Sequence, residues 1–316
     1  MSRLNSSPAV AKAAAADRES TALARAASSA ASRLSDYLEL TKPRIVVLEL
    51  IVAGAAACLA ARHSLNVTAV IHALAATALV AGSASTANQW LERRRDKRMR
   101  RTANRPLPAG RISSVEALLL SAGALVVGLA WLATKVNLTT AALGLASWVT
   151  YVVIYTPMKT RSSYNTAVGA VSGAIPILMG WTATGAPLNL TALSLAGVLF
   201  LWQFPHFMAI AWLYRHDYAV AGHRMLTVVD PSGIRAGVQA ITGASLLIPV
   251  SLIPALSPTS GSPMLYALWA TVLGAVQLAL AIRFALERDE RSARLLLRCT
   301  LIYLPAWMGL QLMVSL

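Results

Sequence analysis

The sequence contains few charged residues and little cysteine. Only 13% of its 316 residues are charged, and its 13 carboxylates are outnumbered by 28 Lys and Arg. Ordinary soluble domains carry about 25% charged residues, so this composition argues against a soluble protein. The two cysteines, Cys58 and Cys299, lie in or beside apolar stretches and lack the paired spacing of a disulfide or metal site. We expect both to be packing residues.

Long apolar runs stand where the charges are missing. The chain is 56% hydrophobic and has a mean hydropathy of +0.58. An apolar run of about 18 residues or more can cross a bilayer as a helix. The runs predict nine transmembrane helices and therefore an all-α polytopic membrane protein. They lie at about 45–62, 67–88, 114–134, 138–157, 165–185, 190–213, 236–256, 264–284 and 295–315.

The cations predict how these spans are oriented. With nine spans, all of the 28 cations except Arg62 and Lys135 fall on the side of the N-terminus. Because cytoplasmic loops carry an excess of Lys and Arg, the N-terminus is expected inside and the C-terminus outside. The net charge of +15 is then a topology signal, and it requires no nucleic-acid partner.

The first 40 residues differ from the rest of the chain. They are rich in Ala and Ser with scattered Arg, and they lack the apolar core of a cleaved secretory signal. Acidic residues such as Asp17 and Glu19 count against a mitochondrial presequence. We expect a disordered cytoplasmic tail at 1–40 and a membrane domain at 41–316, in a bacterial inner membrane.

The stretch NQWLERRRDKRMRRTANRPLPAG, residues 88–110, is the most charged part of the chain. Asn88, Glu92 and Asp96 recur every four residues within it, which places them within an arc of roughly 80° on one helical face. Magnesium is characteristically held by one or two carboxylates together with substrate phosphates, so this row suits a metal-bound diphosphate. The alternative is that Glu92 and Asp96 are surface salt-bridge partners of neighbouring cations.

Four segments resemble the UbiA-type intramembrane prenyltransferases, and most of all the haem O synthase branch of that family. They are N-x-x-x-E-R-x-x-D-x-x-M-x-R-T-x-x-R-P-L from Asn88 to Leu107, KPRIVVLEL at 42–50, YTPMKTRSSYNTAVGAVSGAIPILMGWTATG at 155–185, and LWQFPHFMAIAWLYRHDYAVAGHRML at 201–226.

The resemblance implies nine transmembrane helices around a central cavity, with the active site facing the cytoplasm. It also implies transfer of a farnesyl group from farnesyl diphosphate to a vinyl group of haem b, with Mg²⁺ as the metal. The partners expected on this basis are those two substrates and the lipid bilayer, and a haem A synthase or an oxidase assembly factor is a candidate receiver of the product.

Residue roles follow from the resemblance by position. It assigns catalytic and metal-binding roles to Asn88, Glu92, Asp96 and Asp217, and substrate contacts to Arg101, Arg105, Tyr155, Lys159, His206 and Arg215. Two departures from the family pattern stand out. Glu92 replaces the usual Asp, and Ala221 replaces a second acid that many members outside the haem branch have four residues after Asp217.

His206 has two interpretations. If the sixth helix continues to Asp217, the two residues share a face about three turns apart, and the imidazole could then ligate or orient haem iron. The alternative is a buried histidine that only hydrogen-bonds a neighbouring helix.

Two other functions compete with this one. The first is a UbiA-type enzyme that prenylates an aromatic ring, which the sequence PHF at 205–207 disfavours. The second is a transporter, which the odd number of spans and the position of the carboxylates at helix ends disfavour.

Overall fold

A computed structural model of the chain describes residues 32–61, 64–256 and 262–315. In these ranges all regular structure is helical, and nine helical segments have the length and hydropathy of membrane spans. The predicted fold class and the nine spans are confirmed. The elements are α2 (Pro43–Ala61), α3 (Val67–Asp96), α4 (Ser114–Lys135), α5 (Leu138–Trp148), η1 (Val149–Tyr155), α6 (Thr156–Met158), α7 (Asn165–Ala183), α8 (Leu190–Leu213), α9 (Arg215–Val220), α10 (Leu226–Val229), α11 (Ile234–Leu252), η2 (Ile253–Leu256), α12 (Pro263–Glu287) and α13 (Glu290–Ser315).

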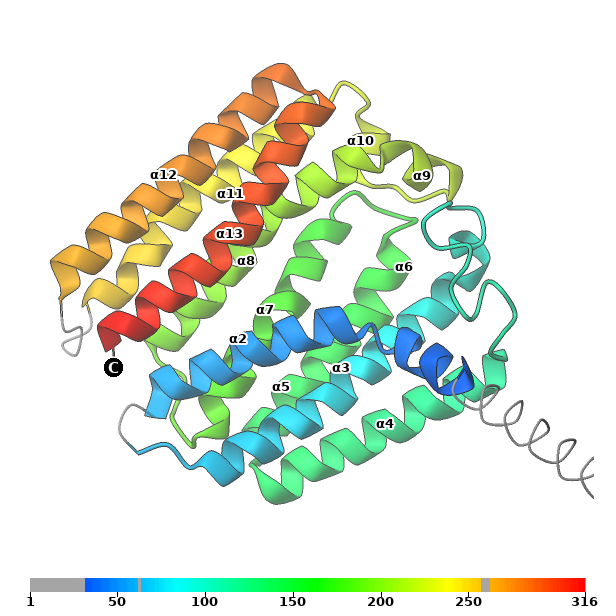
Figure 1. Cartoon of the computed structure of the whole chain (residues 1–316), viewed down its shortest axis with the longest axis horizontal. Helices are drawn as coiled ribbons and strands as arrows, with labels where there is room; N and C mark the ends of the chain where they lie inside the picture. The colour runs from blue at the N-terminus through cyan, green and yellow to red at the C-terminus, as the bar shows by residue number, and fades with distance from the viewer. Residues whose placement is uncertain (1–31, 62–63, 257–261, 316) are drawn as a thin grey trace, which may run out of the picture.

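The spans form two groups that meet along α7 and α8. One group packs α2, α3, α4 and α5 together with α7, and the other packs α11, α12 and α13 together with α8 (Figure 1). The apolar stretches of α7 and α8 are 72% and 56% buried, whereas that of α4 is 22% buried. Helices α7 and α8 are therefore the central pair, and the other spans present more of their surface to lipid.

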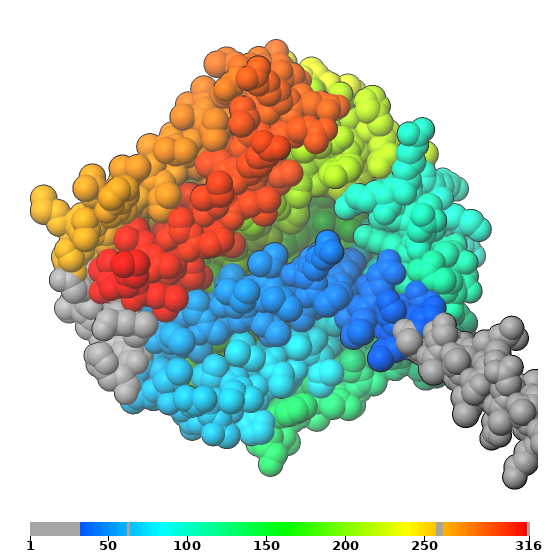
Figure 2. All heavy atoms as spheres, in the orientation of Figure 1, coloured from blue at the N-terminus to red at the C-terminus, as the bar shows by residue number. Residues whose placement is uncertain are grey.

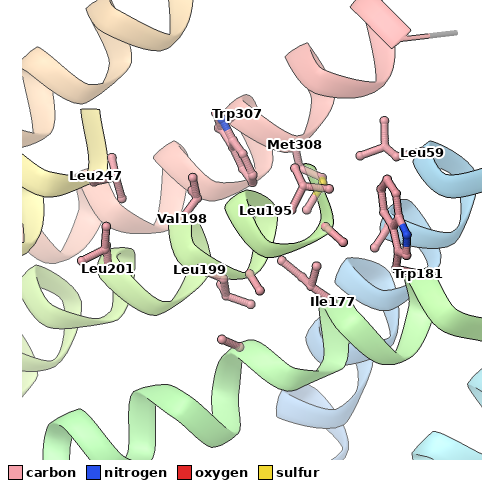
Figure 3. Close-up of a cluster of buried hydrophobic side chains, with 14 of the residues drawn as sticks. Leu59, Ile177, Trp181, Leu195, Val198, Leu199, Leu201, Leu247, Trp307 and Met308 are labelled. Atoms are coloured by element: carbon pink, nitrogen blue, oxygen red, sulfur yellow. The ribbon is translucent and has the colours of Figure 1, made fainter. Parts of the chain in front are cut away.

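The largest buried cluster joins the two groups. Ile177 of α7, Leu195 of α8 and Trp307 of α13 lie within it and are fully buried (Figure 3). Gly180 of α7 contacts α2 so closely that a Cβ there would lie 1.9 Å from the carbonyl oxygen of Ala53. The absence of a side chain at Gly180 is thus what allows these two helices to touch.

A short helix at 32–40 precedes the first span and packs across the end of α4. Arg33 pairs with Glu116, and Arg111 donates a hydrogen bond of 2.8 Å to Asp36. The Gln89 amide of α3 donates to the Leu40 carbonyl at 2.9 Å. Most of the tail predicted for 1–40 lies outside the described residues, and 32–40 form a docked helix.

The two cysteines and the exposed apolar side chains agree with a bundle of membrane helices. Cys58 and Cys299 are both free thiols and half-buried in the bundle. Large apolar side chains such as Leu119, Leu268 and Ile302 are more than half exposed, as expected for side chains that face hydrocarbon rather than water.

Candidate active site

The candidate site is built on the last two turns of α3, which continue as a helix beyond the apolar part of the span. Asn88, Glu92 and Asp96 all lie on one buried face, with 1%, 5% and 1% of their surface exposed. The Asn88 amide donates a hydrogen bond of 3.0 Å to the Glu92 carboxylate, which is the contact that the four-residue spacing predicts. These side chains face the protein interior rather than solvent or lipid.

Each carboxylate is paired with a cation from outside α3. The Lys159 ammonium, in the turn after α6, lies 3.0 Å from both oxygens of Glu92. The Arg105 guanidinium, in the loop before α4, donates a hydrogen bond of 2.8 Å to Asp96. Glu92 and Asp96 are therefore not salt-bridge partners of the cations beside them on α3, which was the alternative interpretation.

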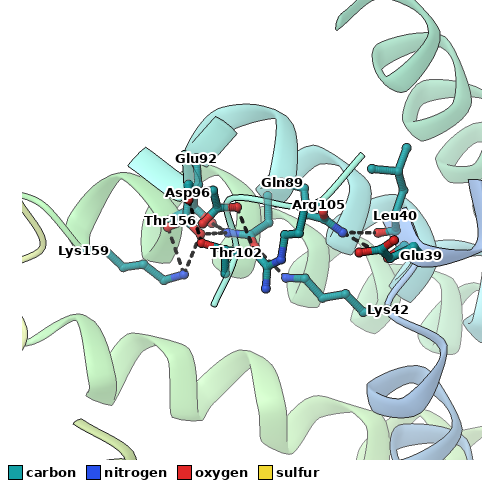
Figure 4. Close-up of polar contacts among 11 residues, drawn as sticks. Glu39, Leu40, Lys42, Gln89, Glu92, Asp96, Thr102, Arg105, Thr156 and Lys159 are labelled. Carbon is teal, nitrogen blue, oxygen red and sulfur yellow. Dashed lines mark hydrogen bonds and ion pairs between the residues drawn. The ribbon is translucent and has the colours of Figure 1, made fainter. Parts of the chain in front are cut away.

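Lys42 reaches the same row from the start of α2, opposite Lys159 (Figure 4). Its ammonium donates a hydrogen bond of 2.7 Å to the Asn88 side-chain oxygen. Its backbone has a φ of +52°, a left-handed conformation that is costly for a residue with a side chain. Burial and the positive charges of Lys159 and Arg105 lower the pKa of Lys42 to about 7.

The pKa of Lys159 shifts in the opposite direction. Burial opposes the charge on its ammonium, but the adjacent Glu92 carboxylate outweighs burial and holds the pKa of Lys159 above its usual range. The Lys159 ammonium also lies 4.7 Å from the ring centre of Tyr155. This cation is therefore permanently charged, whereas Lys42 can lose its proton near neutral pH.

A π-helical segment, η1, positions the residues that approach α3 from the fourth span. Its last hydrogen bond runs from the backbone of Thr156 to the Tyr151 carbonyl. The Thr156 hydroxyl accepts a 3.0 Å hydrogen bond from Asn88. Such expansions of a helix are frequent at functional sites, and this one brings Tyr155, Thr156 and Lys159 towards the end of α3.

The second polar segment is less completely assembled. Helix α8 ends at Leu213, Tyr214 leaves helical geometry with φ −108° and ψ 20°, and Asp217 lies half-buried on the separate helix α9. A shared face from His206 to Asp217 required the sixth helix to continue, and this condition is not met because the helix is broken between them. Within the described residues the Asp217 carboxylate makes no hydrogen bond or ion pair.

His223 lies in the loop after α9, close to the acid row. The neighbouring Arg224 backbone N–H donates to the Lys159 carbonyl at 2.6 Å. Only 3% of His223 is exposed, and no hydrogen bond from the described residues reaches its Nδ1. Burial lowers the pKa of His223, and the Glu92 carboxylate partly offsets that effect.

Two of the predicted substrate-binding arginines have other partners in the structure. The Arg101 guanidinium lies 4.9 Å from the ring centre of Tyr214, which links the loop after α3 to the break after α8. Arg215 donates to the Trp212 carbonyl at 2.7 Å and stacks over the Trp212 ring. These contacts hold the two loops in place, and neither guanidinium pairs with the acids of α3.

His206 lies on α8, in the part that packs against α13. Its Nδ1 is 2.9 Å from the Thr300 hydroxyl, and its ring stacks on that of Trp202 with centres 4.6 Å apart. By helical rise it lies about 10 Å deeper in the membrane than the end of α8. The structure thus separates His206 from the charged row.

The oxygen ligands fit a divalent metal that shares its coordination with a phosphate. Among the described residues no group of three or more His, Cys, Asp or Glu could hold a metal alone. The structure brings together Asn88, Glu92 and Asp96 but not Asp217. Glu92 Oε1 is buried and accepts no hydrogen bond, although the Lys159 ammonium lies 3.0 Å from it, so it keeps a lone pair for a metal. Magnesium commonly binds to such partial protein sites.

The surface is hollowed beside the elements that carry this row. A hollow lies between the start of α2, the loop that follows α3 and the group formed by α8 and α13 (Figure 2). Buried carboxylates, an amide and three cations at the edge of a hydrophobic bundle can together bind a diphosphate group while its apolar substituent extends into the membrane.

Known proteins resemble this chain in both sequence and structure. The pattern of the UbiA prenyltransferase family matches residues 50–304. A protein named protoheme IX farnesyltransferase from Rhodopirellula baltica is 42% identical over 277 residues, which cover 85% of this chain and 96% of the relative. A protein of the same name from Anaeromyxobacter sp. is also 42% identical and covers 90% of this chain and 95% of its own.

Solved structures share the fold at lower sequence identity. A structure of digeranylgeranylglyceryl phosphate synthase has a TM-score of 0.77 at 14% identity and covers 90% of this chain and 99% of its own. A UbiA homologue from Archaeoglobus fulgidus, bound to GPP and Mg²⁺, has a TM-score of 0.68 at 16% identity over 89% of this chain and 99% of its own. The match to the family pattern and to relatives along nearly their whole length establishes that this chain belongs to the UbiA prenyltransferase family.

Proposed function

We propose that this protein transfers a farnesyl group from farnesyl diphosphate to a vinyl group of haem b and so makes haem O. The observation that supports the transfer chemistry is the buried row of Asn88, Glu92 and Asp96 with its cations Lys159 and Arg105. The farnesyl group and the haem acceptor are taken from the names of the 42% identical relatives.

The leaving group is held by residues at the end of α3. Asn88, Glu92 and Asp96 would hold a divalent metal, for which we propose Mg²⁺, and the metal would neutralise part of the diphosphate charge. Arg105 and Lys159 lie beside the carboxylates and can exchange these partners for phosphate oxygens. Their fixed positive charges then favour the negative charge that develops as the diphosphate departs.

The transfer breaks one carbon–oxygen bond and forms one carbon–carbon bond and one new carbon–oxygen bond. The bond between the allylic carbon and oxygen breaks, and its electron pair goes to the diphosphate. The vinyl π electrons form the new carbon–carbon bond. Water then adds to the resulting cation and loses a proton, which leaves a hydroxyl group. A site enclosed by apolar helices protects the farnesyl cation from water until the vinyl group has reacted.

The decisive experiment is product mass. Purified protein is incubated with farnesyl diphosphate and either haem b or 4-hydroxybenzoate, with Mg²⁺ or with a chelator. We expect a haem product heavier by one farnesyl group and one hydroxyl group, and only in the presence of metal. A prenylated aromatic acid, or no haem product at all, would overturn the proposed acceptor.

We also propose on which side of the membrane the active site lies. The excess of cations on the side of the N-terminus supports a cytoplasmic active site in a bacterial inner membrane. On this view a haem A synthase or an oxidase assembly factor receives the product. A cysteine placed at Arg111, in a variant without Cys58 and Cys299, should react with a membrane-impermeant maleimide only after the cytoplasmic face is opened to the reagent.

A further inference from the structure

A cluster at the contact between α8 and α13 carries an inference about the haem acceptor. It consists of His206 and Trp202 of α8 and Thr300 of α13, and we call it the α8–α13 cluster. Thr300 is fully buried, whereas His206 and Trp202 are half-buried. The inference rests on the proposed function, because it concerns how the acceptor is held.

The hydroxyl of Thr300 has only one proton, and its direction is fixed. Thr300 Oγ1 lies 2.7 Å from the Leu297 carbonyl, which can only accept a hydrogen bond. The hydroxyl proton therefore points to Leu297, and towards His206 the same oxygen presents a lone pair. Because His206 Nδ1 lies 2.9 Å from that oxygen, Nδ1 must donate, and a neutral imidazole then carries its free lone pair on Nε2.

The plane of the imidazole is fixed as well. The Trp202 ring stacks on it with centres 4.6 Å apart and an angle of 20° between the planes. The Trp202 indole N–H donates to the Thr300 carbonyl at 2.8 Å. Thr300 thus holds His206 directly through its hydroxyl and indirectly through the indole, and a ring held at two points cannot turn to exchange its nitrogens.

The free nitrogen has no partner within the chain. Among the described residues no hydrogen bond reaches His206 Nε2, although the imidazole lies within a membrane span where water is scarce. Polar groups in such places are normally paired or functional. Metal-binding histidines characteristically donate their other N–H to an oxygen, which fixes the tautomer and strengthens the ligating nitrogen.

We infer that Thr300 and Trp202 are positioning residues that hold His206 with Nε2 available to ligate the iron of the haem acceptor. Iron bound at this nitrogen would fix the macrocycle within the membrane span, about 10 Å deeper than the end of α8. The role of Thr300 is to select the tautomer, and the role of Trp202 is to hold the ring plane.

The test is the absorption spectrum of ferric haem titrated into the purified protein without farnesyl diphosphate. For the unmodified protein we expect a Soret band typical of histidine-ligated haem. His206→Gly should lose this band, and added imidazole should restore it. Thr300→Val should weaken haem binding by about 10-fold or more, as expected for a lost partner of a ligating histidine, whereas Thr300→Ser keeps the hydroxyl and should bind as the unmodified protein does.

Thr242→Val is the matched control. Thr242 is an exposed residue of α11 whose hydroxyl bonds only to the Val238 carbonyl of its own helix, so its loss should leave the spectrum unchanged. An unaltered spectrum and affinity in Thr300→Val, or a histidine-type spectrum that persists in His206→Gly, would overturn the inference. The readout is independent of turnover. A haem product without histidine ligation refutes only this inference, and histidine ligation without a haem product refutes only the proposed function.

Discussion

The polar segments at the ends of α3 and α8 differ in how completely they are assembled. At the end of α3 the carboxylates of Glu92 and Asp96 are buried and paired with cations from other parts of the chain. At the end of α8 the helix stops, and Asp217 lies half-buried on a helix of six residues.

The difference lies in helix continuity. Helix α3 runs unbroken for 30 residues from its apolar part through Asp96, so a four-residue spacing in sequence becomes a row in space. The break at Tyr214 removes that relation for the second segment. The first segment is a buried row of acids whose charges are already compensated by cations. The second is attached to it through loop contacts such as the one between Arg101 and Tyr214.

The largest difference in turnover is expected when one acid in each segment is neutralised. Asp96→Asn should lower turnover by about 10³-fold, because it removes a metal ligand and leaves Arg105 without its partner. Asp217→Asn should lower turnover by only about 10-fold. The smaller loss is expected because Asp217 is not part of the paired row. Steady-state rates with farnesyl diphosphate and haem b measure both.

Asp230→Asn is the control for both variants. Asp230 is half-buried and accepts hydrogen bonds from Ser232 and from the Arg235 backbone. Within the described residues it makes no contact with the acid row, so Asp230→Asn should leave the rate unchanged. Equal losses in Asp96→Asn and Asp217→Asn would show that the two segments contribute alike, and the comparison would fail.

A second experiment separates charge from reach at Glu92. Glu92→Gln should lower turnover on the order of 10²-fold, because the buried Lys159 loses its counter-charge and the metal loses a carboxylate. Glu92→Asp keeps the charge and restores the residue usual in the family, so we expect it to remain within a few-fold of the unmodified rate at saturating Mg²⁺. The Mg²⁺ concentration at half-maximal rate should rise in Glu92→Gln, and an unchanged value would argue against metal binding there.

The pH dependence of diphosphate binding tests Lys42. In the free protein the pKa of Lys42 is about 7, so the ammonium loses its proton as pH rises through that value. A bound diphosphate favours the charged form, and binding above pH 7 must therefore take up a proton. Affinity for inorganic diphosphate should fall about tenfold between pH 6 and pH 8.

Lys42→Arg supplies the control for this pH effect. A guanidinium stays charged across the whole range, so the variant should keep its affinity but lose the pH dependence. If Lys42→Arg and the unmodified protein show the same slope, the titrating group is not Lys42.

The smallest effect is expected for the contact between the two segments. Arg101→Ala removes the stacking on Tyr214, which at an exposed site is worth about 0.5–1 kcal/mol, and should change turnover by about 2- to 5-fold. Arg105 is one of eight Lys and Arg in the same stretch, but it contacts Asp96. Arg105→Ala should therefore lower turnover far more than Arg101→Ala does. Comparable losses in the two variants would mean that Arg101 also contacts substrate.

How much of the site can be predicted depends on whether the residues share a helix. Asn88, Glu92 and Asp96 follow from the sequence because α3 is continuous, and the apolar runs gave the nine spans for the same reason. The break at Tyr214 has no proline or glycine to mark it, so the supposed face from His206 to Asp217 could not be excluded from the sequence.

Contacts between distant segments could not be predicted in this way. Lys42 and Thr156 reach Asn88 across 46 and 68 residues of sequence. For Lys42 the KPR segment gave a weak signal, since it belongs to the family resemblance. For Thr156 and His223 nothing local indicates the site, because the π-helical turn of η1 and the tie between Arg224 and Lys159 depend on tertiary packing.

The bond between Thr300 and His206 has a consequence for biogenesis. During synthesis the α3 row and Lys159 emerge from the ribosome long before Thr300, which belongs to α13. Until that span enters the bilayer, His206 has neither a set tautomer nor a fixed ring. On the inference above, a nascent polypeptide would form the acid row early and would still be unable to ligate haem until α13 has been inserted.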